Sequence, residues 1–296
     1  MIEAFIKRIK KNKRLNRIKN RFPMLALNGV IKPLGRFRFK YETKLYEGQD
    51  VKTMSDQSSI LFFTVHKCAS TLVVKIIKEF SLKKRIIPVD LDSYIITFKN
   101  NDKSVFEDSS FQNKVFRDKG FYYGAMRYFR TIPKMEKYKT FLMLRDPRDV
   151  ITSMYFSLAY SHTVFNEELL IKRDEVQNKT IDEFVLESIP KFKSRYNNYI
   201  NGVLNKENTL FLKYEEMVSD FPEWLIKMTK WLDIYDVELV EKFTKEISFS
   251  PRKEDKHSHI RNIQPGDHLN KLKQSTIDIL NKELHEVLIA LEYIKN

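Results

Sequence analysis

The sequence predicts an α/β protein whose central parallel sheet is flanked by helices in three layers. Two observations lead to this prediction. Apolar, β-favouring runs at 60–65 and 140–144 each pass through a short polar turn directly into an apolar helical pattern. Strand and helix patterns also alternate along the rest of the chain, which is typical of a parallel sheet that is covered on both faces and binds ligands at the carboxyl ends of its strands.

The first junction has the composition of an anion-binding loop. Lys67, Ser70 and Thr71 stand in the turn, and a helix is expected over 71–80. The start of a helix offers unpaired backbone N–H groups and partial positive charge, so residues 67–71 could surround a phosphate. An ordinary turn with a solvated lysine is the alternative. The Walker A pattern is absent, which disfavours a triphosphate with magnesium.

The second junction places an arginine at the exit of a strand. Arg145 follows 140–144, and its planar guanidinium can bind a phosphate through two N–H groups. Ser153 lies about two helical turns further, roughly 11 Å along the axis. Alternatively, Arg145 forms a structural ion pair with Asp146 or Asp149. Together the two junctions predict a ligand with two separate phosphate groups.

The remaining elements follow from periodicity and from breaks in it. Residues 85–92 read as a second strand, and 97–120 as polar, loop-rich chain with some helix. Helices are expected at 180–200, 222–232 and 236–246. One last helix is expected to bury a stripe formed by Ile277, Leu280, Leu284, Val287, Leu288, Leu291 and Ile294.

Four segments resemble, in order, the landmarks of the PAPS-dependent sulfotransferases. HKCASTLV resembles the 5′-phosphosulfate loop, RDPRDVITSMY the 3′-phosphate motif, LFLKYEEMVSDFPEWLIKMTKWLDI the strand–YEDL–helix segment, and HIRNIQPGDHLNKL the RKGxxGDW loop. The resemblance covers about residue 58 to the C-terminus. It implies a P-loop-like sulfotransferase fold and an enzyme that moves a sulfuryl group from 3′-phosphoadenosine 5′-phosphosulfate (PAPS) to a hydroxyl or amine.

The resemblance also implies residue roles. Lys67 falls on the lysine that stabilises charge on the leaving phosphate, and Ser70 and Thr71 on the hydroxyls that bind the 5′-phosphate. Arg145 and Ser153 fall on the pair that holds the 3′-phosphate. The other residues expected at the nucleotide are Cys68, Ala69, Leu72 in place of a tryptophan, Tyr214 and Phe249 at the adenine, and Arg261 of the RKG triplet.

The general base is not assigned by the resemblance. The family's catalytic histidine belongs to a segment that corresponds here to FRDKGFYYGAMRYF, which contains no histidine. A hydroxyl acceptor needs a base within hydrogen-bond reach. His162 is the leading candidate, with Asp92 and Asp118 also open, and each of them also suits a purely structural role. His66 stands too close to the expected phosphosulfate.

Composition suggests one sizeable domain, residues 46–296, behind a basic extension, residues 1–45. The chain has 296 residues and a net charge of +14, and nine Lys or Arg fall between Lys7 and Arg21. Apolar residues recur among them at near-helical spacing, which predicts a basic amphipathic segment (residues 1–22) that binds an anionic membrane surface. A solvated helix packed on the domain is the alternative. No motif of a nucleic-acid reader is present, so no specific nucleic acid is expected.

A single cysteine, together with the lack of a signal peptide or membrane-span pattern, predicts a cytoplasmic protein, peripheral at a membrane if the basic extension binds lipid. Cys68 is either a reactive thiol or a passive small residue. His257 and His259 have no further ligand cluster nearby, so no metal is expected.

The acceptor is expected to be a small molecule, a lipid or a glycan. Two other functions stay open: a P-loop kinase of small molecules, and an inactive nucleotide-binding protein with a basic arm for membrane or nucleic acid.

Overall fold

The computed structural model describes residues 38–99, 101–161, 167–249, 255 and 261–295. The chain divides into two compact units, residues 1–51 and 52–296. The described part of the first unit contains one helix, α4 (Lys40–Tyr46). The basic segment 1–22 lies outside the described residues, and the domain boundary after residue 45 stays a prediction.

The second unit is built on a five-stranded parallel sheet, which confirms the predicted fold class. Its strands are β1 (Ile60–Thr64), β2 (Ile87–Val89), β3 (Phe121–Met126), β4 (Lys139–Leu144) and β5 (Thr209–Lys213). Their order is β2-β3-β1-β4-β5, and every neighbouring pair is parallel. The order reverses between β1 and β4, so the carboxyl ends of these two strands form the topological switch point at which open α/β sheets bind ligands.

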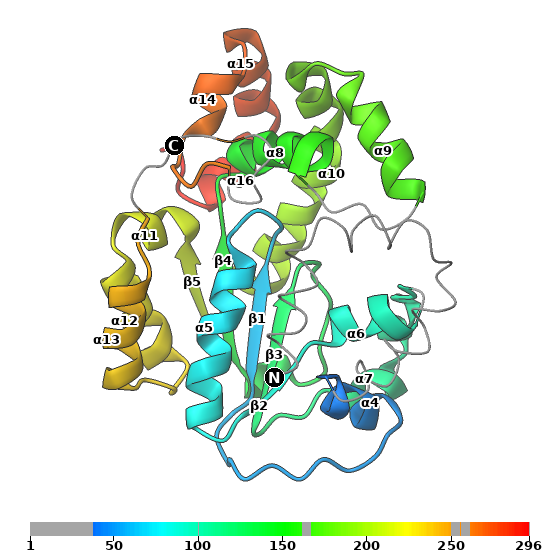
Figure 1. Cartoon of the computed structure of the whole chain (residues 1–296), viewed down its shortest axis with the longest axis vertical. Coiled ribbons are helices and arrows are strands. Elements are labelled where there is room, and N and C mark those ends of the chain that lie inside the picture. Colours follow the sequence, from blue (N-terminus) through cyan, green and yellow to red (C-terminus); the bar gives the residue numbers. More distant parts are fainter. Residues whose placement is uncertain (1–37, 100, 162–166, 250–254, 256–260, 296) are drawn as a thin grey trace, which may run out of the picture. The chain divides into compact units, whose positions relative to one another are not determined.

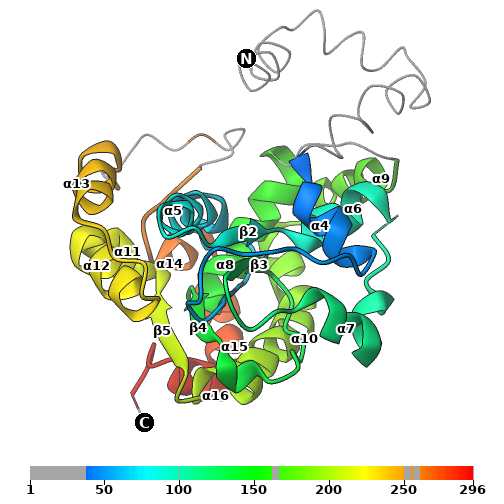
Figure 2. The same ribbon diagram turned by 90° about the horizontal axis from the view of Figure 1, so that it is seen from below.

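Helices cover both faces of this sheet (Figures 1 and 2). On one face lies α5 (Ser70–Lys83), joined to α13 (Val237–Glu246) by an ion pair of 2.6 Å between Glu79 and Lys242. On the other face lie α10 (Ile181–Tyr199), α15 (Gln274–Glu283) and α16 (His285–Ala290). The remaining elements are α6 (Leu91–Phe98), η1 (Ser104–Glu107), α7 (Ser109–Val115), η2 (Met135–Lys137), α8 (Pro147–Phe156), η3 (Ser157–Ser161), α9 (Glu167–Gln177), η4 (Ile200–Leu204), α11 (Tyr214–Ser219), α12 (Phe221–Trp231) and α14 (Asp267–Lys271).

The structure corrects two predicted elements. The strand expected at 85–92 is only β2, because Asp90 caps the start of α6 by accepting a hydrogen bond from the Ser93 backbone N–H. The single last helix is two helices that meet at Leu284. Its apolar stripe is nevertheless buried at Leu280, Leu284, Val287, Leu288 and Leu291.

Helix α10 fixes the carboxyl ends of three strands through two buried tyrosines. The Tyr199 hydroxyl donates to the backbone oxygens of Thr64, at 2.7 Å, and Met126, at 3.1 Å. The Tyr196 hydroxyl donates to the backbone oxygen of Arg145 at 2.6 Å. Since these oxygens lie at the ends of β1, β3 and β4, the helix sets the positions of all three turns that follow.

Candidate active site

The turn after β1 has the backbone of an anion-binding loop. Lys67 and Ala69 adopt left-handed conformations, with φ of 68° and 49°, and Ala69 is the N-cap of α5. Side chains disfavour this region, so a non-glycine residue there costs of order 1–3 kcal/mol and is characteristic of functional turns. Alternating backbone conformations of this kind turn N–H groups inward and form a concavity for anions.

Lys67 is not the solvated lysine of an ordinary turn. Its side chain is half-buried, and burial lowers the pKa of its ammonium to about 8, with the charges of Arg145 and Arg261 acting in the same direction. Three cationic side chains therefore share one electrostatic environment. In the described part of the chain Lys67 forms no ion pair, so its charge is available to an anion.

Arg127 joins this loop, a contact that the sequence patterns did not reveal. It follows β3 directly, and its Nε and Nη2 atoms lie 3.2 and 3.0 Å from the Ser70 hydroxyl. Ser70 is buried, Thr71 is exposed and Leu72 is half-buried on the first turn of α5. The signal that identified Arg145, an arginine directly after a strand, did not identify Arg127 because the strand before it, β3, was not predicted from the sequence.

Cys68 is a passive residue of the loop. It is completely buried, and burial raises the pKa of its thiol to about 12. The thiol therefore stays protonated near neutral pH, which rules out the reactive thiolate considered from the sequence.

Arg145 forms the ion pair that was considered as the alternative to phosphate binding. Its Nη2 atom lies 3.1 Å from Asp149 Oδ2, whereas Asp146 pairs with Arg148. The guanidinium also stacks on the Tyr214 ring at 4.5 Å and approaches the backbone oxygen of Lys67 at 3.4 Å. Arg145 Nε is buried without a hydrogen-bond partner among the described residues, so the ion pair leaves part of its binding capacity unused.

Asp149 connects this junction to the loop before α14. It accepts hydrogen bonds from the backbone N–H groups of Gly266, at 2.9 Å, and His268, at 3.0 Å, and from His268 Nδ1 at 2.7 Å. Burial alone would raise its pKa, but the hydrogen bonds from His268 and the charge of Arg145 hold the pKa of this carboxyl well below its usual range. Gly266, with φ of 80°, supplies the left-handed turn that this approach requires.

Two predicted adenine residues lie on the same side. The Tyr214 hydroxyl donates to the backbone oxygen of Ile263 at 2.7 Å, and burial raises the pKa of that hydroxyl to about 12. The backbone oxygen of Phe249 accepts a hydrogen bond from Gln264 Nε2 at 3.1 Å, and its half-buried ring packs edge-on against Phe221.

Arg261 packs against a phenylalanine of α8, the helix that also carries Ser153. Arg261 is buried, pairs with Asp267 and lies 4.0 Å from the centre of the Phe156 ring. Ser153 stands three residues before Phe156 on α8, and residues at this spacing share a helix face. Ser153 and Phe156 therefore lie on one side of α8, and Ser153 makes no hydrogen bond to Arg145 in the described chain.

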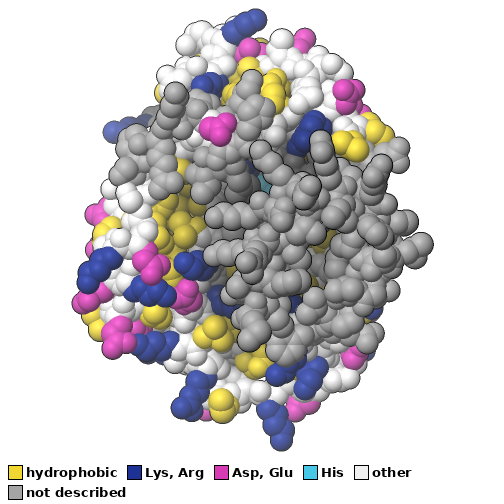
Figure 3. Space-filling view, in the orientation of Figure 1, with side chains coloured by type: hydrophobic (Ala, Val, Ile, Leu, Met, Phe, Trp, Pro, Cys, Tyr) yellow, Lys and Arg dark blue, Asp and Glu magenta, His cyan; other side chains and the backbone are white. Residues whose placement is uncertain are grey.

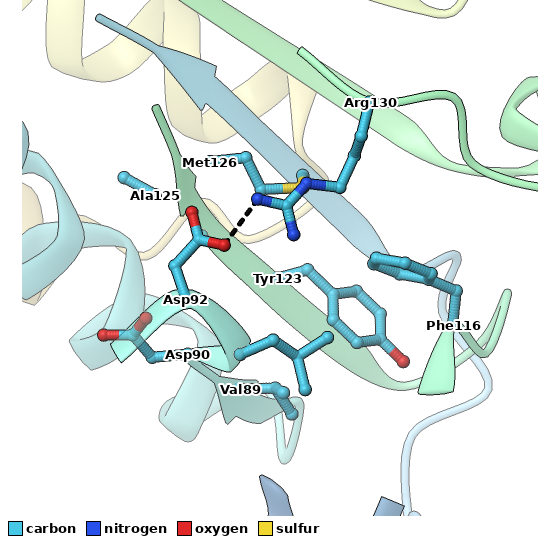
Figure 4. A pocket seen from close by; sticks show the side chains of 10 residues that line it. Val89, Asp90, Asp92, Phe116, Tyr123, Ala125, Met126 and Arg130 are labelled. Atoms are coloured by element: carbon cyan, nitrogen blue, oxygen red, sulfur yellow. Dashed lines mark hydrogen bonds and ion pairs between the residues drawn. The ribbon is translucent and has the colours of Figure 1, made fainter. Parts of the chain in front are cut away.

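The structure also locates the alternative bases. Asp92 is buried in an ion pair with Arg130, in a small hollow between α6 and β3 that Figure 4 shows. Asp118 precedes β3 and so lies at the amino ends of the parallel strands, whereas Lys67 lies at their carboxyl ends. This separation removes Asp118 as a base. Burial, together with nearby cations, lowers the pKa of His66 to about 3, too low for it to take a proton efficiently near neutral pH. His162 lies outside the described residues.

Two further properties concern only the described part of the chain. No group of three or more His, Cys, Asp or Glu side chains there is arranged to hold a metal ion. None of the described helices has both the length and the apolar character needed to cross a membrane.

Comparisons with known structures agree with the fold. The mouse sulfotransferase SULT7A1, complexed with PAP, is 17% identical and superimposes with a TM-score of 0.52 over 86% of this chain and 94% of its own. Retinol dehydratase with retinol and PAP is 12% identical, with a TM-score of 0.52 over 84% of this chain and 86% of its own. Retinol dehydratase in complex with androsterone and the inactive cofactor PAP is also 12% identical, with a TM-score of 0.52 over 84% of this chain and 84% of its own.

A family model described as the sulfotransferase domain matches residues 127–284, whereas no curated protein matches the chain. The matched region is more than half of the 296 residues and contains Arg145, Tyr214 and Arg261. The loop after β1 precedes it, so the geometry above is the independent evidence for that loop. The chain therefore belongs to the sulfotransferase family and is an enzyme of that type.

Proposed function

We propose that the protein transfers a sulfuryl group from PAPS to a hydroxyl or amine of an acceptor. The observation that carries this proposal is the pairing of two cationic anion sites, Lys67 and Arg145, at the carboxyl ends of adjacent strands. Arg145 Nη1 lies 3.4 Å from the Lys67 backbone oxygen, so the two turns are in contact. This arrangement suits a nucleotide with one phosphate at each turn, and the neighbours described above contain PAP.

The residues fit such a nucleotide. Lys67, the hydroxyls of Ser70 and Thr71, and the loop backbone at Cys68 and Ala69 would hold the 5′-phosphosulfate, with Arg127 as an additional donor. Lys67 would offset negative charge on the 5′-phosphate oxygens as the S–O bond breaks.

The 3′-phosphate and the adenine would occupy the other side of the switch point. Arg145, with its unpaired Nε, would bind the 3′-phosphate together with Ser153 and Arg261. Tyr214, Phe249 and Leu72 would border the adenine. PAPS supplies the activated sulfuryl group, and a base on the protein removes the proton of the acceptor; we retain His162 as the proposed base.

The wider setting is also part of the proposal. A cytoplasmic location is supported by the single cysteine of the chain. The acceptor is a small molecule, a lipid or a glycan, and the basic segment 1–22 contacts an anionic membrane surface. Neither a metal cofactor nor a specific nucleic acid is part of the proposed mechanism.

The test combines nucleotide binding with transfer from labelled PAPS. PAP should bind in calorimetry and raise the melting temperature, while ATP with magnesium and an oligonucleotide should not. Lys67→Ala should remain folded and lose at least a hundredfold in transfer rate, whereas Lys230→Gln, on the exposed face of α12, should retain full activity. Stabilisation by ATP with magnesium but not by PAP would instead favour a kinase, and full turnover by Lys67→Ala would remove Lys67 from the mechanism.

A further inference from the structure

We propose that the acceptor carries an anionic group, a carboxylate, sulfate or phosphate, near the hydroxyl that receives the sulfuryl group, and that Arg195 and Lys103 bind this anion. The inference rests on the proposed function and adds the chemical class of the acceptor. The observation behind it is a pair of cations that converge on Tyr128 without a counter-charge among the described residues.

The topology places these residues on the acceptor side. Arg145 and Tyr214 follow β4 and β5, so the adenosine end of the nucleotide belongs on that side of β1. A displacement at sulfur needs the incoming oxygen opposite the leaving oxygen. The acceptor therefore approaches from the side of β3, the other neighbour of β1.

Tyr128, which lies just after β3, collects two cations around its ring. The Arg195 guanidinium, on α10, lies 4.4 Å from the ring centre, and the Lys103 ammonium, immediately before η1, lies 4.3 Å from it. The ring attracts both charges through its π-face and is itself 40% exposed. Two separate segments thus bring a positive charge to one accessible tyrosine ring on a third segment.

Arg195 also contacts the loop after β1. Arg195 Nη1 lies 3.4 Å from His66 Nδ1, and His66 directly precedes Lys67. Next to burial, the charges of Arg127, Arg195 and Lys103 lower the pKa of His66, so these cations act on a single imidazole. The imidazole is therefore neutral near pH 7 and adds no opposing charge.

No described carboxylate pairs with Arg195, Lys103 or Arg127. This contrasts with Arg130, which is paired with Asp92 in the adjacent hollow (Figure 4). It also contrasts with the α5–α13 face, where Lys and Arg side chains are interspersed with Asp and Glu (Figure 3). The lack of a carboxylate partner among the described residues therefore distinguishes the cations around Tyr128 from Arg130 and from the lysines of the α5–α13 face.

A bound anion would offset the unfavourable free energy of burying Arg195 near other positive charges. Arg195 is only 8% exposed, and a buried cation without a partner is unfavourable, as is the repulsion between neighbouring like charges. The phosphosulfate accounts for Lys67 and for Arg127, which contacts Ser70. Arg195 and Lys103 are left for a second anion, which the acceptor supplies.

The primary test is calorimetric titration of the full-length protein with inorganic sulfate, with and without saturating PAP. Arg195→Gln and Lys103→Gln should each weaken sulfate binding by about tenfold, since each removes a charge-assisted hydrogen-bond donor. PAP affinity should stay within twofold of wild type. Lys230→Gln removes an equal charge elsewhere and should leave both affinities unchanged. If Arg195→Gln has a much lower melting temperature than wild type, Arg195→Lys, which retains the positive charge, replaces it in the titration.

Matched acceptors then identify the source of the anion. The pairs are 4-hydroxyphenylacetate against its amide, 4-nitrophenyl glucuronide against the glucoside, and phosphatidylglycerol against diacylglycerol vesicles. The charged member of at least one pair should show the lower KM with wild-type enzyme, and Arg195→Gln should abolish that preference.

Two outcomes overturn the inference. The first is equal sulfate affinity in wild type and both glutamine variants. The second is a parallel fall in PAP affinity, which would assign the cations to the nucleotide. Failure of the proposed function looks different, because wild-type protein would then not bind PAP at all.

Discussion

Asp149 joins two parts of the chain that are 117 residues apart in sequence. The sequence identifies it only as an acid in the first turn of a helix and a possible partner of Arg145. In the structure its buried carboxylate accepts hydrogen bonds from the Arg145 side chain, from Gly266 and twice from His268. It therefore orients the arginine and closes the loop beside it at the same time.

Asp149→Asn should destabilise the protein by about 3–5 kcal/mol, because it leaves Arg145 buried without its anion. Urea denaturation at pH 7 measures this loss. PAP affinity should fall as well, since the asparagine no longer holds Arg145 and the 261–268 loop in one arrangement. A matched control is Asp174→Asn on α9, remote from this network, which should change the free energy of unfolding by less than about 0.5 kcal/mol.

The same carboxylate sets a pH dependence of stability. The folded-state pKa of Asp149 lies below its ordinary value of 3.8, so the folded protein binds the proton less readily than the unfolded chain. The contribution of Asp149 to the free energy of unfolding is therefore complete above about pH 5 and is lost as the pH falls below about 4. Urea denaturation from pH 6 to pH 3 should show a smaller decline for Asp149→Asn than for wild type, and parallel curves would contradict this account.

At the scale of elements, α10 determines how the three turns of the site are spaced. Tyr199→Phe removes one donor from two strand ends and should cost about 1–3 kcal/mol in the free energy of unfolding. It should also weaken PAP binding, because Thr64 and Met126 directly precede the turns that carry Lys67 and Arg127. Tyr235→Phe is the control, since that hydroxyl has no hydrogen-bond partner in the described chain. Wild-type stability in Tyr199→Phe would show that packing alone holds the strand ends.

Sequence patterns located most elements but not β3. The strands β1 and β4 and the helices α5, α10, α12 and α13 lie within a few residues of their predicted ranges, and β5 lies in the segment that resembles the family's strand–YEDL–helix landmark. β3 was missed because Gly124 and Ala125, residue types of low strand propensity, interrupt its run of β-favouring aromatic residues. Once β3 was missing, the position of Arg127 at a strand end could not be seen.

The candidate site was predictable where a local pattern encodes it. Lys67, Ser70 and Arg145 stand at strand–helix junctions, and periodicity reveals such junctions. Arg195 and Lys103 lie on a helix and before a short turn that only tertiary packing brings to Tyr128. No spacing in the sequence connects these three positions, so neither propensity nor motif could identify them.

At the scale of the whole molecule, the charge of +14 is concentrated partly in the basic segment 1–22. We expect full-length protein to sediment with vesicles that contain anionic lipid and not with neutral vesicles. Replacing Lys7, Arg8, Lys10 and Lys11 by glutamine should weaken this binding by about 1 kcal/mol per charge, while PAP affinity is unchanged. Equal sedimentation of both proteins would exclude the segment as a membrane contact.

The complete burial of Cys68 has a practical consequence for experiments on this enzyme. It is the only sulfhydryl in the chain, and it lies between the two left-handed residues of the turn after β1. Alkylating reagents can reach it only when that turn opens. The rate at which the native protein becomes alkylated thus reports directly on breathing of the turn, with no introduced label, and a ligand that closes the turn slows it.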